Sequence, residues 1–150
     1  MDMVQLLRGV ELFDGLSDSE LARLGTLCRE AHYRKGEVIT QQGQPGTELF
    51  IVREGLVEVT VGVLAADGGH APPQTVVNLG TGQVVGEMAL VDHGPRSATV
   101  RCVTPTTLHV IEREAFEQLC LLDHHIGLVV YRNLAADLSF KLRHRNLARR

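Results

Sequence analysis

The chain has 150 residues, of which 44% are hydrophobic and 22% are charged, and its formal net charge is −3 at pH 7. This size and composition indicate one soluble domain over residues 1–150, since single domains commonly have about 100 to 200 residues. The charge excludes a general attraction to nucleic acid or to anionic membranes. Without a long apolar run or an export signal, we expect a cytoplasmic protein with no membrane span.

The three cysteines, Cys28, Cys102 and Cys120, are widely spaced and have apolar neighbours. An odd number at such spacing favours buried, reduced thiols over a disulfide or a metal site. We therefore expect them to pack in the interior.

The first well-marked helix begins after Ser17. Ser17-Asp18-Ser19-Glu20 matches a capping box, in which Ser17 is the N-cap and Glu20 reaches back to the Ser17 amide. Apolar residues then follow at helical spacing: Leu21, Leu24, Leu27 and Cys28. We expect N-terminal helices over about residues 3–30, and this helix should cover a core.

From about residue 31 to residue 112 the pattern is that of short strands separated by turns. The apolar run Leu49–Val52 predicts a strand buried on both faces, and the alternation in Val57–Val61 predicts a strand with one wet face. We interpret these two runs as a hairpin that turns at Gly55. Further strands are expected at Val38–Ile39, 74–79, 98–103 and 107–111. Leu64–Pro73 is expected to be a surface insertion. Such a succession predicts an antiparallel β jelly roll, also called a double-stranded β-helix.

The last part, about residues 113–148, is predicted to be helical. A short helix over 114–122 carries Phe116 and Leu119 inward. From Ile126 to Leu142 an apolar residue recurs at every fourth position, which we interpret as a continuous stripe on one long helix. The expected fold is therefore mainly β, with flanking helices at both ends and one short helix inside the roll.

The segment from Gly86 to Thr99 has the most specific chemistry. Gly86 permits a close backbone approach at a strand end, and Glu87–Leu90 reads as one helical turn whose first amides suit an anion. Arg96 follows a turn and can give a phosphate two parallel hydrogen bonds. Glu87 can accept from neutral hydroxyls and balance Arg96 when no ligand is bound. The two charges together favour a ligand with a phosphate and a sugar hydroxyl, such as a cyclic nucleotide.

Gly86-Glu87-Met88-Ala89-Leu90, then five residues, then Arg96-Ser97-Ala98-Thr99-Val100 resembles the phosphate-binding cassette of the cyclic-nucleotide-binding domains. That family includes the catabolite activator protein and the regulatory subunits of protein kinase A. The resemblance covers about Leu12 to Leu142. Family members often have Asp where this chain has Thr47.

The resemblance implies that eight residues bind the ligand: Val85, Gly86, Glu87, Met88, Ala89, Arg96, Ser97 and Ala98. Arg96 pairs with the cyclic phosphate, and Glu87 accepts from the ribose 2′-hydroxyl. The amides of the helical turn and Ser97 add contacts, and apolar side chains such as Val85 line the base and sugar.

The function implied by the resemblance is that of a non-catalytic sensor that binds cAMP in preference to cGMP, with no other cofactor. Ligand orders the cassette, and the C-terminal helix moves as a lid, with Phe140, Lys141 and His144 in the lid region. The further partner is an unidentified effector protein or a fused domain. No direct DNA binding is expected, because the chain ends about where a helix-turn-helix domain would follow.

Two other functions stay open. The roll could serve as an interaction or dimerisation domain that has lost its ligand, pairing with a copy of itself through the Ile126–Leu142 helix; Glu87 and Arg96 would then only hold a turn as a salt bridge. An enzyme such as a cupin would need clustered His and Glu metal ligands. The dispersed histidines disfavour that function, and we expect no catalytic or metal-binding residues, with His93 exposed and incidental.

Overall fold

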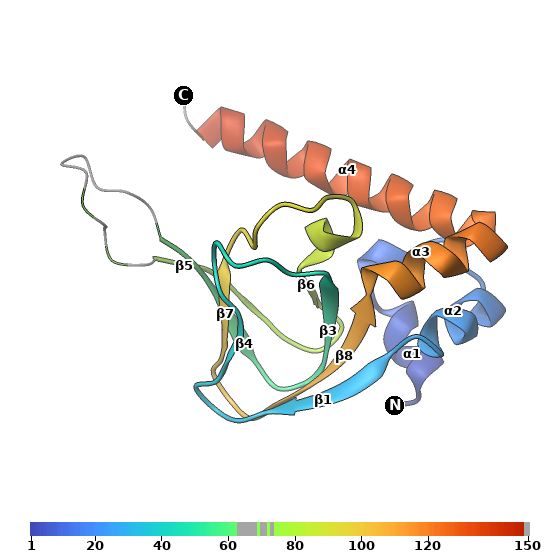
Figure 1. The fold of residues 1–150 in the computed structure, drawn as a ribbon, viewed down its shortest axis with the longest axis horizontal. Coiled ribbons are helices and arrows are strands. Elements are labelled where there is room, and N and C mark those ends of the chain that lie inside the picture. Colours follow the sequence, from blue (N-terminus) through green and yellow to red (C-terminus); the bar gives the residue numbers. More distant parts are fainter. Residues whose placement is uncertain (63–68, 70–71, 73, 149–150) are drawn as a thin grey trace. The chain divides into compact units, whose positions relative to one another are not determined.

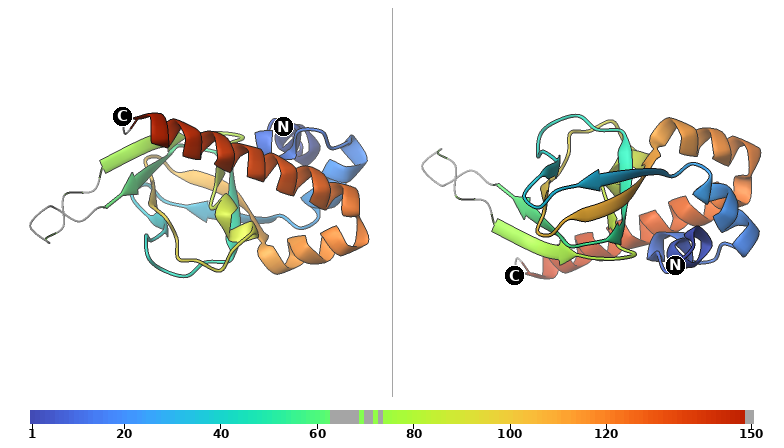
Figure 2. Two further views of the ribbon diagram at one scale, coloured as in Figure 1. Left: turned by 90° about the horizontal axis from the view of Figure 1, so that it is seen from above. Right: turned by 90° about the horizontal axis from the view of Figure 1, so that it is seen from below.

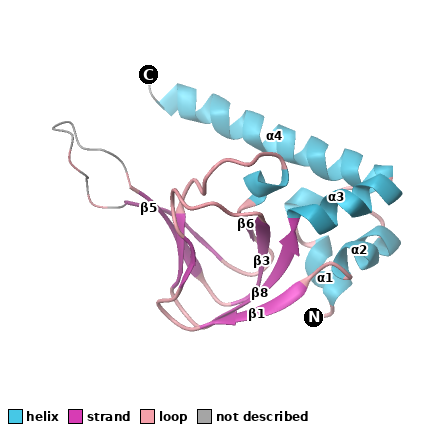
Figure 3. Ribbon diagram, viewed as in Figure 1, coloured by secondary structure: helices cyan, strands magenta, loops and turns pink. Residues whose placement is uncertain are grey.

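The computed structural model describes residues 1–62, 69, 72 and 74–148, without the side chains of 145–148. Most of the predicted insertion at Leu64–Pro73 lies outside these residues. The chain divides into two compact units, one of Met1–Thr26 with Ala115–Arg150 and one of Leu27–Glu114. Helices make up most of the first unit, and the strands lie in the second, as the colours of Figure 3 show. No helix in the described part of the chain combines the length and the apolar character needed to cross a membrane.

The helical unit begins with three short helices and ends with two longer ones. In chain order they are α1 (Met3–Arg8), η1 (Glu11–Phe13), α2 (Asp18–Gly25), α3 (Arg113–Leu122) and α4 (His124–Ala148), where η marks a 3-10 helix. The first two residues of α3 belong to the other unit. Figure 2 shows α4 as one uninterrupted helix.

The capping box at the start of α2 is confirmed. The backbone amide of Ser17 donates to Glu20 Oε1 at 2.9 Å, and the amide of Glu20 donates to Ser17 Oγ at 3.2 Å. Leu21 and Leu24 are fully buried, as their helical spacing predicts. The expected extension of the helix is wrong, because α2 ends at Gly25, before Leu27 and Cys28, and a strand begins at Arg29. This cap satisfies two amides that a helix start otherwise leaves without partners.

Polar contacts fix the first half of α4 to the N-terminal segment. Asn133 Nδ2 donates to the carbonyl oxygens of Leu12 at 3.0 Å and Asp14 at 2.9 Å. His125, the second residue of α4, has Nδ1 at 2.6 Å from Glu20 Oε2 of α2. These contacts hold two distant parts of the sequence in one unit.

The straight apolar stripe expected on α4 is wrong. Ile126, Val130 and Leu134 are buried, but Leu142 is 60% exposed. With 3.6 residues per turn, each step of four residues advances about 40° beyond a full turn, so Leu142 lies about 160° around the helix from Ile126. Val129, three residues after Ile126, is buried instead. The buried face thus follows the true helical period, and among the described side chains of α4 it covers only the first half of the helix.

The second unit holds two four-stranded antiparallel sheets. In chain order the strands are β1 (Arg29–Tyr33), β2 (Val38–Thr40), β3 (Glu48–Glu54), β4 (Val57–Val61), β5 (Gln74–Leu79), β6 (Val84–Val85), β7 (Thr99–Cys102) and β8 (Thr106–Glu112). One sheet has the order β1-β8-β3-β6 and the other β2-β7-β4-β5 (Figure 1). Their inner faces share one core, formed by Phe50, Val52, Val57, Val85, Val100, Cys102, Leu108 and Val110. The predicted jelly roll with flanking helices is confirmed.

The hairpin expected at Gly55 is wrong. β3 pairs with β8 and β6, whereas β4 pairs with β5 and β7 in the other sheet. Gly55 has a φ of +110°, in the left-handed region that favours glycine, and turns the chain from one sheet to the other. The burial of Leu49–Val52 on both faces is confirmed, because side chains alternate between the faces of a strand and all four residues are at most 3% exposed.

All three cysteines are free thiols. Cys102 is buried, whereas Cys28 and Cys120 are half-buried. Burial raises the pKa of the Cys28 thiol to about 11. The thiol therefore stays protonated near neutral pH and is a poor nucleophile.

Candidate functional site

The cassette begins where β6 ends. Val85 is buried and pairs with Phe50 of β3, and Gly86 then adopts a left-handed conformation with a φ of +78°. A β-carbon at Gly86 would lie 2.6 Å from Arg96 Nη1 and 2.9 Å from the carbonyl oxygen of Glu48. The site therefore needs glycine for its backbone angle and for the close approach of Arg96.

A single 3-10 turn, η2 (Glu87–Leu90), follows Gly86, and Figure 1 shows it in yellow-green after β6. Ala89 and Leu90 are buried, Glu87 is half-buried and Met88 is 40% exposed. The amide of Ala89 donates to the carbonyl of Gly86 at 3.0 Å. For the Ala89 amide to donate to a ligand, its hydrogen bond to the Gly86 carbonyl must break or be shared with the ligand.

Arg96 lies in the loop before β7, and its backbone is fixed by the 41–46 turn. Its amide donates to the carbonyl of Gln44 at 2.8 Å, and its carbonyl accepts from the amide of Gly43 at 2.9 Å. Ser97 and Ala98 continue the loop, the first exposed and the second half-buried. The Ala98 carbonyl accepts from Thr40 Oγ1 at 3.1 Å. The backbone of Arg96 is thus held by the 41–46 turn, and Ala98 after it is held by Thr40 of β2.

The guanidinium of Arg96 is held against β3. Nη1 donates to the carbonyl of Glu48 at 2.8 Å, and Cζ lies 5.5 Å from the centre of the Phe50 ring. A guanidinium has five N–H donors, and over the described residues this is the one hydrogen bond that its side chain makes. Burial lowers the pKa of Arg96 somewhat, while Glu48 and Glu112 act in the opposite direction. A positioned cation with donors to spare can bind an anion.

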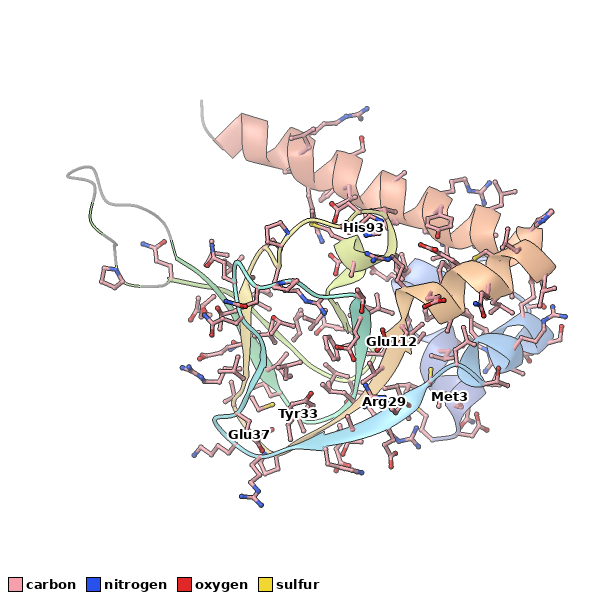
Figure 4. All side chains as sticks on the ribbon, viewed as in Figure 1. Met3, Arg29, Tyr33, Glu37, His93 and Glu112 are labelled. Carbon is pink, nitrogen blue, oxygen red and sulfur yellow. The ribbon has the colours of Figure 1, made fainter. Side chains whose placement is uncertain are left out.

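The acidic neighbours of Arg96 are two facing residues on adjacent strands. Glu48 of β3 pairs in register with Glu112 of β8, and Arg29 Nη2 lies 3.0 Å from Glu48 Oε2. Arg29, on β1, and Glu112, on β8, are labelled in Figure 4. Burial and the nearby Glu112 raise the pKa of Glu48, and the cations of Arg29 and Arg96 partly offset this. Glu48 and Glu112 are the carboxylates that raise the pKa of Arg96, and the balancing role expected of Glu87 stays a prediction.

The predicted residues thus fall into two groups. Val85, Gly86, Glu87, Met88 and Ala89 form the β6–η2 corner, and Arg96, Ser97 and Ala98 form the loop that returns to β7. Arg96 meets the corner at Gly86. His93 lies between the two groups in the sequence and is exposed; Figure 4 labels its position.

The predicted lid residues belong to the helical unit, whereas the cassette belongs to the strand unit. Phe140, Lys141 and His144 are all exposed on the second half of α4. The rings of Phe140 and His144 lie 3.9 Å apart at their centres, and Lys141 Nζ lies 3.0 Å from Asp137 Oδ2. The lid stays a prediction.

A metal site of the cupin kind would need several ligands grouped around one ion. Among the described residues, no three His, Cys, Asp or Glu side chains are grouped in that way. His109, which the sequence places among the dispersed histidines, is buried in β8 beside Arg53.

The family described as cyclic nucleotide-binding domain matches residues 30–123. The cAMP-dependent protein kinase regulatory subunit of Dictyostelium discoideum is 31% identical over 120 residues, which are 80% of this chain and 34% of that protein. The cGMP-dependent protein kinase 2 of Homo sapiens is 33% identical over 113 residues, 75% of this chain and 14% of that protein. This chain thus spans about a third or less of the length of both relatives.

A solved structure agrees with these sequence relatives. The catabolite activator protein of Thermus thermophilus superposes with a TM-score of 0.78 at 32% identity, over 92% of this chain and 61% of that one. The family match covers β1 to α3 and includes the whole cassette. The chain therefore belongs to the cyclic nucleotide-binding domain family.

Proposed function

We propose that this chain is a sensor module that binds a cyclic nucleotide at the Gly86–Ala98 cassette. Arg96 pairs with the cyclic phosphate, and the amides at the start of η2 add donors. The observation that supports this most is the Arg96 guanidinium, which β3 holds beside Gly86 while most of its donors remain available to a ligand. Arginine suits this role because its planar fork matches two phosphate oxygens.

Glu87 directs the proposal to a nucleotide rather than to a bare anion. Its carboxylate would repel a phosphate placed beside it but accepts well from a neutral ribose 2′-hydroxyl. Its half-buried place at the start of η2, next to Gly86, supports that division between the two charged residues.

We propose cAMP as the preferred ligand. The relatives are named for kinases that depend on cAMP and on cGMP, so their names do not separate the two nucleotides. The preference rests on Ser97, because threonine at this place often marks cGMP binders in the family. Occupancy of the cassette would be transmitted to α4, whose residues Phe140, Lys141 and His144 form the proposed lid, and from there to an effector protein or a fused domain.

A second candidate function is dimerisation through α4. Phe140 and Leu142, on its second half, are each 60% exposed. Exposed apolar side chains can contact a second copy of the chain, but these two residues lie two positions apart, on nearly opposite sides of the helix, so each would meet a different part of a partner surface. Sedimentation velocity with and without cAMP tests this candidate. A monomer in both conditions at micromolar protein would contradict it.

Isothermal titration calorimetry tests the proposed function. The protein is titrated with cAMP, with cGMP, and with 5′-AMP as a control for the cyclic phosphate. We expect saturable binding of cAMP, weaker binding of cGMP, and weaker binding again of 5′-AMP. Absence of heat with both cyclic nucleotides at high micromolar concentration would remove the proposal and leave the interaction domain as the better account.

The role of Glu87 has its own test, because a change of this residue should affect binding only when its expected partner, the ribose 2′-hydroxyl, is present. Glu87→Gln keeps a neutral acceptor and should weaken cAMP binding by about threefold to tenfold, the cost of replacing a charge-assisted hydrogen bond by a neutral one. For 2′-deoxy-cAMP, which lacks the hydroxyl, the variant and the wild type should bind about equally. A variant that weakens both ligands to the same degree would show that Glu87 does not contact the ribose.

A further inference from the structure

Arg113 stands where the chain passes from one compact unit to the other. It is the first residue of α3 and the last but one of the strand unit, which ends at Glu114. The rest of α3, from Ala115, belongs to the helical unit, and α4 follows one residue after α3 ends. The first turn of α3 is therefore the segment of backbone that joins the strand unit, which holds the cassette, to the rest of α3 and to α4. A movement of this turn acts directly on that connection.

The side chain of Arg113 reaches back to the end of the cassette turn. Its Nη1 donates to the carbonyl oxygens of Ala89 at 3.2 Å and Asp92 at 2.7 Å. Its backbone amide donates to the carbonyl of Thr47, just before β3, at 2.9 Å. One residue thus joins the start of α3 to η2 and to the strand that carries Glu48.

These bonds fall at the end of η2 opposite to Gly86. Carbonyl groups at the end of a helical turn lack partners within the turn, and a cation is the favoured partner there. Ala89 itself is 7% exposed, so water has little access to replace the guanidinium. A ligand that takes up the amides at the start of η2 therefore acts on a turn whose other end is held by Arg113.

We propose that Arg113 is the positioning residue that couples occupancy of the cassette to the first turn of α3, an inference that rests on the proposed function. A shift of η2 toward the phosphate changes the position of the Ala89 and Asp92 carbonyls, and the guanidinium moves with them. Coupling of this kind is reciprocal. If the ligand shifts the equilibrium between two positions of α3 by some factor, the favoured position of α3 strengthens ligand binding at the cassette by that same factor.

Hydrogen–deuterium exchange with and without cAMP tests this coupling in wild type, Arg113→Ala and Arg113→Lys. In wild type, cAMP should change exchange both in η2 and in the amides of α3. In Arg113→Ala, the change in η2 should remain while the change in α3 is lost, and cAMP affinity should fall about fivefold or more. Arg113→Lys keeps the charge but not the fork, so its α3 response should lie between the two.

Arg101→Ala is the matched control, since Arg101 is an exposed arginine on β7 of the same unit. It should keep both exchange changes. Unaltered strand exchange without ligand shows that each variant is folded. A change in α3 that persists in Arg113→Ala, or a wild-type α3 that does not respond while calorimetry shows cAMP binding, would overturn the coupling alone. Absence of binding in wild-type calorimetry would overturn the proposed function and this inference together.

Discussion

The guanidinium of Arg96 occupies the space that a side chain at Gly46 would fill. A β-carbon built on Gly46 would clash with Nε, Cζ and Nη2 of Arg96. Gly46 and Arg96 are fifty positions apart in the sequence, and the backbone bonds between the 41–46 turn and the Arg96 loop bring them together. The missing side chain at Gly46 is thus a condition for the position of the arginine that the proposed function requires.

Gly46→Ala should therefore weaken cAMP binding while the protein stays folded. The clash is with a flexible side chain, so Arg96 can swing away at small cost to the fold. We expect affinity to fall by about tenfold or more, equivalent to about 1.4 kcal/mol. Calorimetry measures the affinity, and thermal unfolding checks the fold.

Gly80→Ala is the matched control for this variant. A β-carbon at Gly80 would meet its neighbours at 3.8 Å and 4.0 Å, which is ordinary contact. Its affinity should match the wild type. If Gly46→Ala and Gly80→Ala bind cAMP equally well, the position of Arg96 seen here is not the one that binds the ligand.

Ser17→Ala should destabilise the protein by about 1 kcal/mol, the usual cost of losing an N-cap. The amide of Glu20 then loses its bond to Ser17 Oγ at the start of α2. Urea unfolding followed by circular dichroism measures the loss. Ser139→Ala, at an exposed position within α4, should cause none. Equal stability of the two variants would mean that the cap adds nothing to the fold.

His109 should make the protein less stable in mild acid. Its side chain is buried, and Nε2 lies 3.2 Å from Arg53 Nη1. Since arginine can only donate, Nε2 accepts and Nδ1 carries the proton, and over the described residues Nδ1 has no hydrogen-bond partner. Burial lowers the pKa of His109, and Arg53 lowers it further, while Glu30 acts in the opposite direction.

The direction of the pH effect follows from that lowered pKa. The unfolded chain takes up a proton near the ordinary histidine pKa of about 6.5, before the folded protein does, so the free energy of unfolding decreases as pH falls below that value. Urea unfolding from about pH 7.5 to pH 5.5 should show the decrease in the wild type. His109→Gln should show a smaller pH dependence. An equal pH dependence in both proteins would assign the effect to other groups.

The parts that sequence alone predicted correctly rest on neighbours along the chain. The capping box joins residues three apart, and the turn after Gly86 depends on a glycine at a strand end. The burial of Leu49–Val52 follows from an unbroken apolar run. In each case the local sequence pattern carries the signal, although the burial of β3 itself is completed by distant strands.

The parts that sequence did not predict depend on pairing between distant segments. Nothing near Gly55 indicates that β3 and β4 enter different sheets, because that choice is made by β8 and β7. Glu48 and Glu112 come together only through the register of β3 and β8, and Arg113 reaches the cassette only because α3 begins beside η2. The Ile126–Leu142 stripe was wrong for a local reason, since a four-residue repeat is not the period of an α-helix.

The most direct test of the central claim is calorimetric titration of wild type, Arg96→Ala and the exposed control Arg101→Ala with cAMP. Removing one partner of a buried charged pair typically costs about 3 kcal/mol, which corresponds to a hundredfold or more in affinity. We predict a loss of about that size for Arg96→Ala and wild-type affinity for Arg101→Ala, with both variants folded by thermal unfolding. Binding of cAMP to Arg96→Ala within about threefold of wild type would contradict the account, since the phosphate would then lie elsewhere.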